Sequence, residues 1–124
     1  IPRSNIISVM AIDPSGVAAR NRRGPGQWQQ FSNYGAQSVD IAAPGTLVLG
    51  IPSDGRIDCG DGTSFAAPMV TAAVALVWAQ HPDWDYQTVR RAILETARPA
   101  EALRGKCVTE GVLDIEAALN WRPQ

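Results

Sequence analysis

One apolar segment, from residue 63 to about residue 80, constrains the fold more than any other part of this 124-residue chain. The segment is rich in Ala, Val and Leu, and its apolar side chains fall on every side of a helical wheel. A helix of that kind is typically buried on all sides. Pro82 ends it, because proline has no backbone N–H and restricts the residue before it, His81. We expect the rest of the chain to supply too few packing partners for such a helix.

The segments before this helix predict an α/β layer fold. Residues 6–12 are almost continuously apolar and rich in β-branched side chains, which is typical of a strand buried on both faces in a parallel sheet. Shorter strands are expected at residues 39–42 and 47–51. Residues 17–38 and 52–62 carry many glycines and polar side chains, so we expect them to be mostly loop. Strands followed by a buried helix indicate α/β layers.

Two more helices are expected in the last third of the chain. Asp85 is a good N-cap for an amphipathic helix that stops before Pro99. Asp114 is expected to start a final short helix, which buries Ile115, Ala118 and Leu119. Domains commonly have about 50 to 250 residues, so we assign residues 1–124 to one domain at most.

The charge balance argues against nucleic acid and membrane partners. The chain has 11 Lys and Arg residues against 12 Asp and Glu residues, a net charge of −1. Such a chain has no basic surface for nucleic acid or for an anionic membrane. Its basic cluster, Arg20, Arg22 and Arg23, is expected to be a solvated loop. The most apolar run, residues 72–79, is shorter than the about 20 residues that a membrane span needs.

The start of the apolar helix is the segment that carries chemistry. A glycine-rich turn delivers Ser64 to the first helical turn, where backbone N–H groups have no partner within the helix. The positive end of the helix dipole lies there as well, so negative charge beside the Ser64 hydroxyl is stabilised. Pro68 removes the amide that would otherwise bond the Ser64 carbonyl. Taken alone, Thr63 and Ser64 also fit a simple helix N-cap.

Residues 62–68 read Gly-Thr-Ser-Phe-Ala-Ala-Pro and resemble the serine motif of the subtilisin-like serine proteases, Gly-Thr-Ser-x-Ala-x-Pro. Two earlier segments resemble further motifs of that family in the same order. Residues 31–35 are similar to its Phe-Ser-Asn-x-Gly motif, and residues 40–45 are similar to its Asp-x-x-Ala-Pro-Gly motif. The resemblance covers nearly the whole chain, because it extends to residues 6–13, 81–84 and 111–114.

The resemblance implies a fold and an activity. The family fold is an α/β three-layer sandwich around a parallel sheet, and this chain resembles its C-terminal half, which is incomplete on its own. The family activity is that of a serine endopeptidase acting on polypeptide substrates. Ser64 matches the nucleophile, whose hydroxyl attacks the peptide carbonyl and forms an acyl-enzyme. The backbone amide of Ser64 would help to stabilise the oxyanion, with Thr63 as a supporting hydrogen-bond donor.

The other members of the family's catalytic triad have no match in this sequence. The family order is Asp, His, Ser, yet no Asp-Ser-Gly, Asp-Thr-Gly or His precedes Ser64. The family's oxyanion Asn is also expected upstream, because Asn5 does not match its motif. His81 follows Ser64 by 17 residues, which is about 25 Å along a helix, whereas a general base lies about 3 Å from its proton donor. Turn-forming roles beside glycines are expected for Asp54, Asp58 and Asp61.

We therefore expect a C-terminal fragment without proteolytic turnover of its own, completed by an N-terminal half that carries the missing Asp and His. The alternative from another class is a non-catalytic protein-binding module on the same fold. A nucleotide-binding domain is disfavoured, since no Gly-x-Gly-x-x-Gly follows the first strand. Half of a parallel sheet leaves an unpaired edge and exposed apolar faces, so we expect self-association, a domain swap or binding of the missing half.

Further expectations concern cysteines, cations and location. We expect a secreted or exported protein in which Cys59 and Cys107 pair, because free thiols in glycine-containing loops are unusual in secreted proteins. Asp40 matches a family position near a weak cation site, with backbone oxygens around Pro2 and Ser4, so calcium is the one cofactor considered. A single carboxylate offers too few hard ligands for an assignment, and a turn cap is the alternative role of Asp40.

Overall fold

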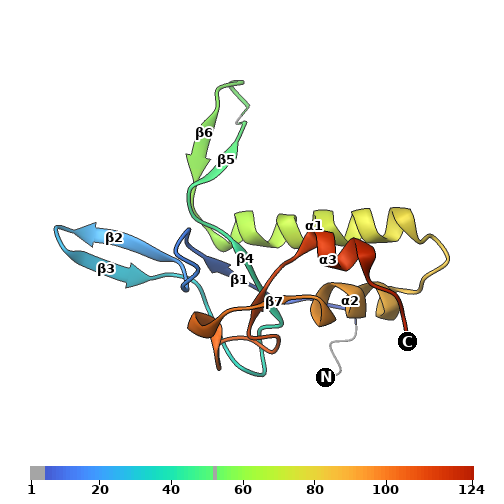
Figure 1. The fold of residues 1–124 in the computed structure, drawn as a ribbon. Coiled ribbons are helices and arrows are strands. Elements are labelled where there is room, and N and C mark those ends of the chain that lie inside the picture. The colour runs from blue at the N-terminus through green and yellow to red at the C-terminus, as the bar shows by residue number, and fades with distance from the viewer. Residues whose placement is uncertain (1–4, 52) are drawn as a thin grey trace.

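A four-stranded sheet forms the centre of the computed structural model, which describes residues 5–51 and 53–124. The order across the sheet is β1 (Val9–Ile12), β4 (Ile41–Pro44), β8 (Gly111–Val112) and β7 (Arg98–Pro99). The strand pairs β1–β4 and β4–β8 are parallel, and β7 pairs antiparallel with β8. The strand expected at residues 6–12 is therefore confirmed in its second half, and β1 is an edge strand (Figure 1).

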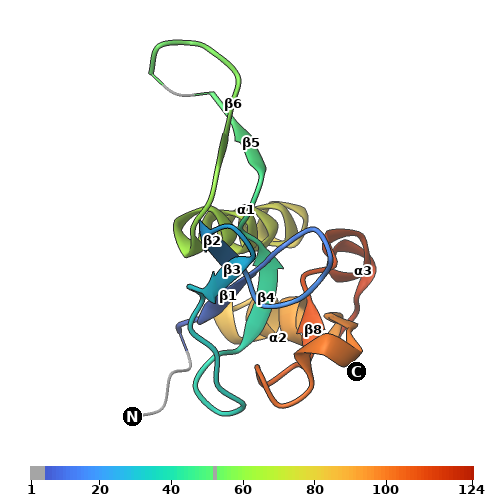
Figure 2. The same cartoon turned by 90° about the vertical axis from the view of Figure 1, so that its left-hand side faces the viewer.

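The two faces of this sheet are covered differently. Three α-helices pack on one face through a shared cluster that includes Ala11, Ile41 and Ala43 from the strands. The other face carries Met10, which packs with side chains of the 3₁₀ turn η1 (Glu101–Leu103) and its neighbours. The helices are α1 (Thr63–Gln80), α2 (Tyr86–Glu95) and α3 (Ile115–Asn120). The expected α/β fold with a parallel sheet is confirmed, with helices on one face in the described part of the chain (Figure 2).

Helix α1 has the predicted bounds but only one buried stripe. Its fully buried residues recur at helical spacing: Ala66, Val70, Ala73 and Val77. Apolar residues on its other sides remain in solvent, and Trp78 is 41% exposed. The expectation that an all-round apolar helix lacks partners in this chain is confirmed. By length and composition α1 is apolar enough to cross a bilayer, unlike the shorter run considered from sequence, but core helices of water-soluble proteins pass the same test.

Two antiparallel hairpins depart from the sequence expectation. β2 (Arg20–Gly24) pairs with β3 (Gln27–Gln30) inside the expected loop 17–38, and the turn between them places Gly26 at a φ of 70°. β5 (Val48–Gly50) pairs with β6 (Asp58–Gly60), which lies in the second expected loop. The loop predictions were wrong there because polar and glycine-rich sequence carries no alternating apolar pattern, whereas backbone pairing needs none.

Both predicted helix N-caps are confirmed. The Asp85 carboxylate accepts a hydrogen bond from the Thr88 N–H at 2.7 Å, and the Asp114 carboxylate accepts one from the Ala117 N–H at 2.9 Å. Hydrogen bonds from the Thr88 backbone and side chain lower the pKa of Asp85 below its usual value. The burial predicted for α3 was wrong at Ile115, which faces solvent, and right at Ala118, which is fully buried.

Replacing Ile93 by alanine is expected to lower the free energy of unfolding by about 2 to 5 kcal/mol. Ile93 is 0% exposed in the cluster that joins α1, α2 and the sheet, so the truncation leaves a cavity. The matched control is Ile115→Ala at a side chain that is 37% exposed, with an expected loss of about 1 kcal/mol or less. Urea unfolding followed by circular dichroism measures both, and equal losses would contradict this packing.

Candidate active site

Two backbone hydrogen bonds position the turn that precedes Ser64. The Gly45 N–H, directly after β4, donates to the carbonyl of Ile12 at the end of β1 (2.9 Å). The Gly45 carbonyl then accepts from the Gly62 N–H (2.7 Å), one residue before α1 begins. Ser64 is therefore held at the carboxyl ends of the parallel strands β1 and β4. Ligands of open α/β sheets bind at this edge.

Glycine is required on both sides of this junction. A Cβ at Gly45 would overlap the Cβ of Ala11 and lie 2.9 Å from the Gly62 carbonyl oxygen. Gly62 has a φ of 157°, which side-chain-bearing residues rarely adopt, and its Cβ would lie 3.0 Å from the Ser64 Oγ. The backbone of the turn can thus approach both the sheet and the serine hydroxyl only without side chains.

The N-terminus of α1 is open around Ser64. Its N-cap, Gly62, provides no side-chain hydrogen bond, and no acidic residue lies in the first turn. Ser64 is exposed, and its hydroxyl has no hydrogen-bond partner among the described residues. Thr63, the first residue of the helix, is exposed as well. Unpaired N–H groups at the positive end of an 18-residue helix can stabilise a developing oxyanion next to the hydroxyl.

No described residue stands beside Ser64 as a general base. His81 lies at the opposite end of α1, where its backbone N–H caps the helix and its ring stacks on Trp84 at 3.9 Å between centroids. The exclusion of His81 as the base therefore agrees with its position. Asp54 accepts a hydrogen bond from the Arg56 N–H at 3.1 Å, as expected of a turn former. Asp61 instead accepts from the Leu47 N–H at 2.8 Å, 14 residues away in the sequence.

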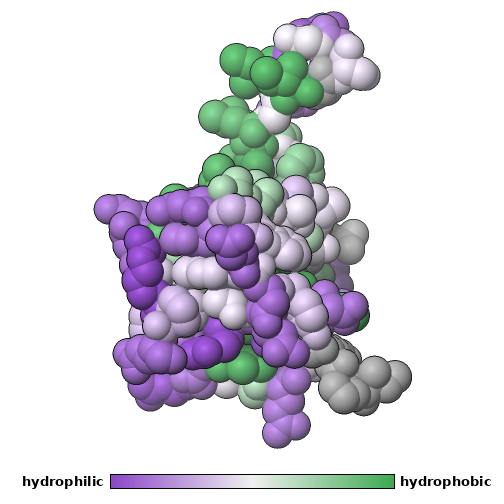
Figure 3. Space-filling view, turned by 90° about the vertical axis from the view of Figure 1, so that its right-hand side faces the viewer, coloured by the Kyte–Doolittle hydropathy of each residue, from purple (hydrophilic) through white to green (hydrophobic). Residues whose placement is uncertain are grey.

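A shallow pocket lies beside the first turn of α1, and sequence reasoning did not find it. It has a volume of about 360 Å³, and its walls include Ile51, Cys59 and Phe65. The Phe65 ring packs against Gly60, where a Cβ would overlap the ring. Figure 3 shows apolar surface running from this region along the projecting β5–β6 hairpin. These residues come together only through the pairing of β5 with β6, which no sequence pattern indicates.

Protein groups contact both carboxylate oxygens of Asp40, which was considered above as a weak cation ligand or a turn cap. One carboxylate oxygen forms an ion pair with Arg90 at 2.8 Å, and the other accepts from the Ser8 N–H at 2.7 Å. No group of three His, Cys, Asp or Glu side chains suited to a metal ion occurs in residues 5–51 and 53–124. Pro2 and Ser4 lie outside the described residues. The described contacts of Asp40 tie the start of β1 and α2 together.

The structure does not contain the expected disulfide. Cys59 and Cys107 are both free thiols. Cys59 is exposed in β6, whereas Cys107 is buried on the far side of the sheet, 3.8 Å from the Thr109 hydroxyl. The two sulfurs lie in different parts of the fold and therefore do not pair. The spacing of the cysteines in the sequence does not reveal this separation.

The comparisons with known proteins agree with this geometry. The family model described as Subtilase family matches residues 2–114. The chain belongs to the subtilase family. Mycosin-5 of Mycobacterium tuberculosis (strain ATCC 25618 / H37Rv) is 34% identical over 129 residues, covering 94% of this chain and 20% of Mycosin-5. Subtilisin-like protease SBT3.8 of Arabidopsis thaliana is 33% identical over 122 residues, covering 88% of this chain and 16% of that protein.

Solved subtilase structures share the fold. A chain in the structure of the subtilase cytotoxin SubAB assembly matches 92% of this chain with a TM-score of 0.75 and 28% identity, and the match covers 35% of that chain. MycP1 from Mycobacterium smegmatis matches 96% of this chain with a TM-score of 0.71 and 27% identity, over 31% of its own length. This subtilase chain thus spans about a fifth of Mycosin-5 and about a third of these two solved chains.

Gly45→Ala is expected to lower the free energy of unfolding by about 1 to 3 kcal/mol, because the new methyl group overlaps Ala11 and presses on the Gly62 carbonyl. Gly50→Ala in the β5–β6 hairpin is the matched control, since a Cβ there meets nothing within 4 Å. Its effect is expected to stay within about 0.5 kcal/mol. Thermal unfolding of the two variants tests the close approach at Gly45, and a harmless Gly45→Ala would contradict it.

Thiol titration under non-reducing conditions is expected to find both cysteines free. Cys59 should react with a disulfide reagent in the native protein, because it is exposed, and Cys107 only after unfolding, because it is buried. The variants Cys59→Ser and Cys107→Ser assign the fast and the slow thiol. A protein with no reactive thiol after denaturation would instead contain the disulfide.

Proposed function

We propose that this chain supplies the nucleophile of a serine-type endopeptidase. The observation that carries the proposal is the exposed Ser64 at an uncapped helix N-terminus, in a motif within the segment matched by the subtilase family. A hydroxyl in this position needs only a proton acceptor and a bound peptide to attack a carbonyl. The substrate class is polypeptide.

The proposed chemistry proceeds through an acyl-enzyme. Ser64 Oγ attacks the scissile carbonyl carbon while its proton passes to an imidazole supplied from outside the described residues. The resulting oxyanion accepts a hydrogen bond from the Ser64 N–H at the start of α1, with Thr63 in support. Collapse of the tetrahedral intermediate breaks the peptide C–N bond, and the amine leaves with the proton. Water then hydrolyses the Ser64 ester and regenerates the hydroxyl.

The proton acceptor and its aspartate are proposed to come from a preceding N-terminal half. Support comes from the coverage, since this chain spans 20% of Mycosin-5 and 31% of MycP1. A triad enzyme that loses one member loses a factor of about 10⁴ to 10⁶ in turnover, so the 124-residue chain alone is proposed to be inactive. A non-catalytic protein-binding module stays the second candidate, favoured by the absence of a base beside Ser64 among the described residues.

We also propose that the protein is exported from the cytosol. Two of the structural neighbours carry names that point to secretion: MycP1 is described as a component of the ESX-1 type VII secretion system, and SubAB as a cytotoxin. A similar polypeptide-cleaving role outside the cytosol is proposed here. The two free thiols carry no weight for location, because the expected disulfide is absent.

A fluorogenic casein assay is expected to detect no turnover attributable to Ser64 in the 124-residue chain, so Ser64→Ala leaves the background unchanged. In a longer polypeptide that includes an upstream Asp and His, a fluorophosphonate is expected to label Ser64, because the base then activates the hydroxyl. Ser64→Ala should abolish that labelling, while Ser53→Ala, at another exposed serine, should not. A complete triad without labelling would favour the non-catalytic module.

A further inference from the structure

The neck of the β5–β6 hairpin contains a bulge directly before the turn that carries the serine. The neck lies between the paired strands of the hairpin and the hydrogen bond from Gly62 to Gly45. Within it two residues of one strand, Thr46 and Leu47, stand opposite one residue of the other, Asp61. An extra residue on one strand is a β-bulge, a device that bends a strand and redirects side chains next to active sites.

Leu47 has a strained backbone in this bulge. Its φ of 53° lies in the left-handed region, where the Cβ of any residue other than glycine crowds the backbone. Its side chain is 65% exposed, so packing contributes little to holding this conformation. Its N–H donates a hydrogen bond to a carboxylate oxygen of Asp61 at 2.8 Å. Since a strained residue persists only where its surroundings determine its conformation, this bond is a restraint on Leu47.

Asp61 passes the same restraint to the serine through the backbone. Its carboxylate is bonded to Leu47, and its carbonyl shares a planar peptide unit with the Gly62 N–H, which is bonded to the sheet. The Gly62 carbonyl accepts a hydrogen bond from the Phe65 N–H at 3.0 Å, in the first turn of α1. Ser64 lies between these two bonded residues, so the orientation of the Asp61–Gly62 peptide sets its place.

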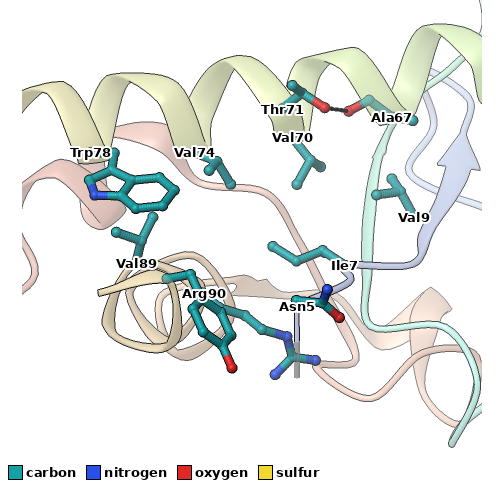
Figure 4. A pocket seen from close by; sticks show the side chains of 11 residues that line it. Asn5, Ile7, Val9, Ala67, Val70, Thr71, Val74, Trp78, Val89 and Arg90 are labelled. Carbon is teal, nitrogen blue, oxygen red and sulfur yellow. Dashed lines mark hydrogen bonds between the residues drawn. The ribbon is translucent and has the colours of Figure 1, made fainter. Parts of the chain in front are cut away.

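Packing fixes α1 beyond its first turn but not at the serine. Ala66 and Val70 are buried in the cluster that α1 shares with the sheet. Figure 4 shows Val70 pointing from the helix toward Ile7 and Val9. The first two residues of the helix are exposed and have no such packing. Their orientation therefore depends on the hydrogen bonds of the turn that precedes them.

We propose that Asp61 is a positioning residue for the reaction at Ser64. Its carboxylate holds Leu47 in the left-handed conformation and thereby fixes the turn that presents the Ser64 hydroxyl and N–H to the substrate. This inference rests on the proposed endopeptidase function. Asp61 acts through the hydrogen bond that its oxygen accepts and not through its charge, because the residue is exposed and water and salt screen its field.

Fluorophosphonate labelling of the longer polypeptide that includes an upstream Asp and His tests the proposal. Asp61→Ala removes the acceptor, and the labelling rate constant is expected to fall about tenfold or more, because small displacements of a reacting group are costly. Asp61→Asn keeps an oxygen in the same place and is expected to stay within about threefold of wild type. Asp54→Ala is the matched control, since it removes another hairpin carboxylate that accepts a backbone N–H but does not bridge the neck.

A second substitution separates positioning from a loss of stability. Leu47→Gly in the Asp61→Ala background is expected to restore the rate to within about threefold of wild type, because glycine adopts a φ of 53° without a restraint. Glycine also loosens the unfolded chain, so a merely structural role of Asp61 predicts a further loss instead of a rescue. Rates are compared at a temperature where circular dichroism shows every variant folded.

Amide hydrogen exchange in the same polypeptide reports on the turn without any activity. Asp61→Ala is expected to speed exchange at the Gly62 amide as well as at Leu47, whereas Asp54→Ala should change neither. A wild-type polypeptide that is not labelled contradicts the proposed function, and the exchange at Gly62 then decides whether Asp61 positions the turn. Unchanged exchange at Gly62, a labelled Asp61→Ala as fast as wild type, an Asp61→Asn as slow as Asp61→Ala, or a failed rescue by Leu47→Gly would overturn the inference.

Discussion

The hydrogen bond from the Gly62 N–H to the Gly45 carbonyl joins the sheet to the helix that carries the serine. This bond joins the two ends of the segment that forms the β5–β6 hairpin. The hairpin can therefore project while both of its ends stay at the carboxyl edge of the strands. Because Gly45 is also bonded to Ile12, the orientation of the α1 N-terminus is tied to the strand register. The position of the Ser64 hydroxyl is thereby set by backbone geometry, which a mobile side chain could not provide.

The predictions from sequence were correct where all the interacting residues lie in one short segment. The bounds of α1 follow from its composition and Pro82, and the caps at Asp85 and Asp114 follow from a carboxylate that reaches an amide three residues away. The Ser64 motif is local in the same sense, because it lies within residues 62–68. In each case the partners lie within a few residues of each other, and no knowledge of the tertiary fold is needed.

The features that were not predicted all depend on partners that lie far apart in the sequence. The β5–β6 hairpin pairs the apolar strand Val48–Gly50, whose region was predicted, with Asp58–Gly60, where no alternating apolar pattern indicates a strand. Cys59 and Cys107 looked equivalent in sequence, but one lies on a projecting hairpin and the other beneath the sheet. The ion pair of Asp40 with Arg90, 50 residues later, could not be recognised without the packing of α2.

The incomplete burial of α1 bears on the proposed completion by an N-terminal half. A helix that is apolar all round but buried along one stripe must gain further partners to leave water, and its exposed flank adjoins the free β1 edge. A strand edge offers a single row of N–H and C=O groups, so it can pair with only one added strand at a time. We therefore expect the proposed N-terminal half to add a strand to β1, which would pair the open edge and cover the adjoining apolar flank of α1.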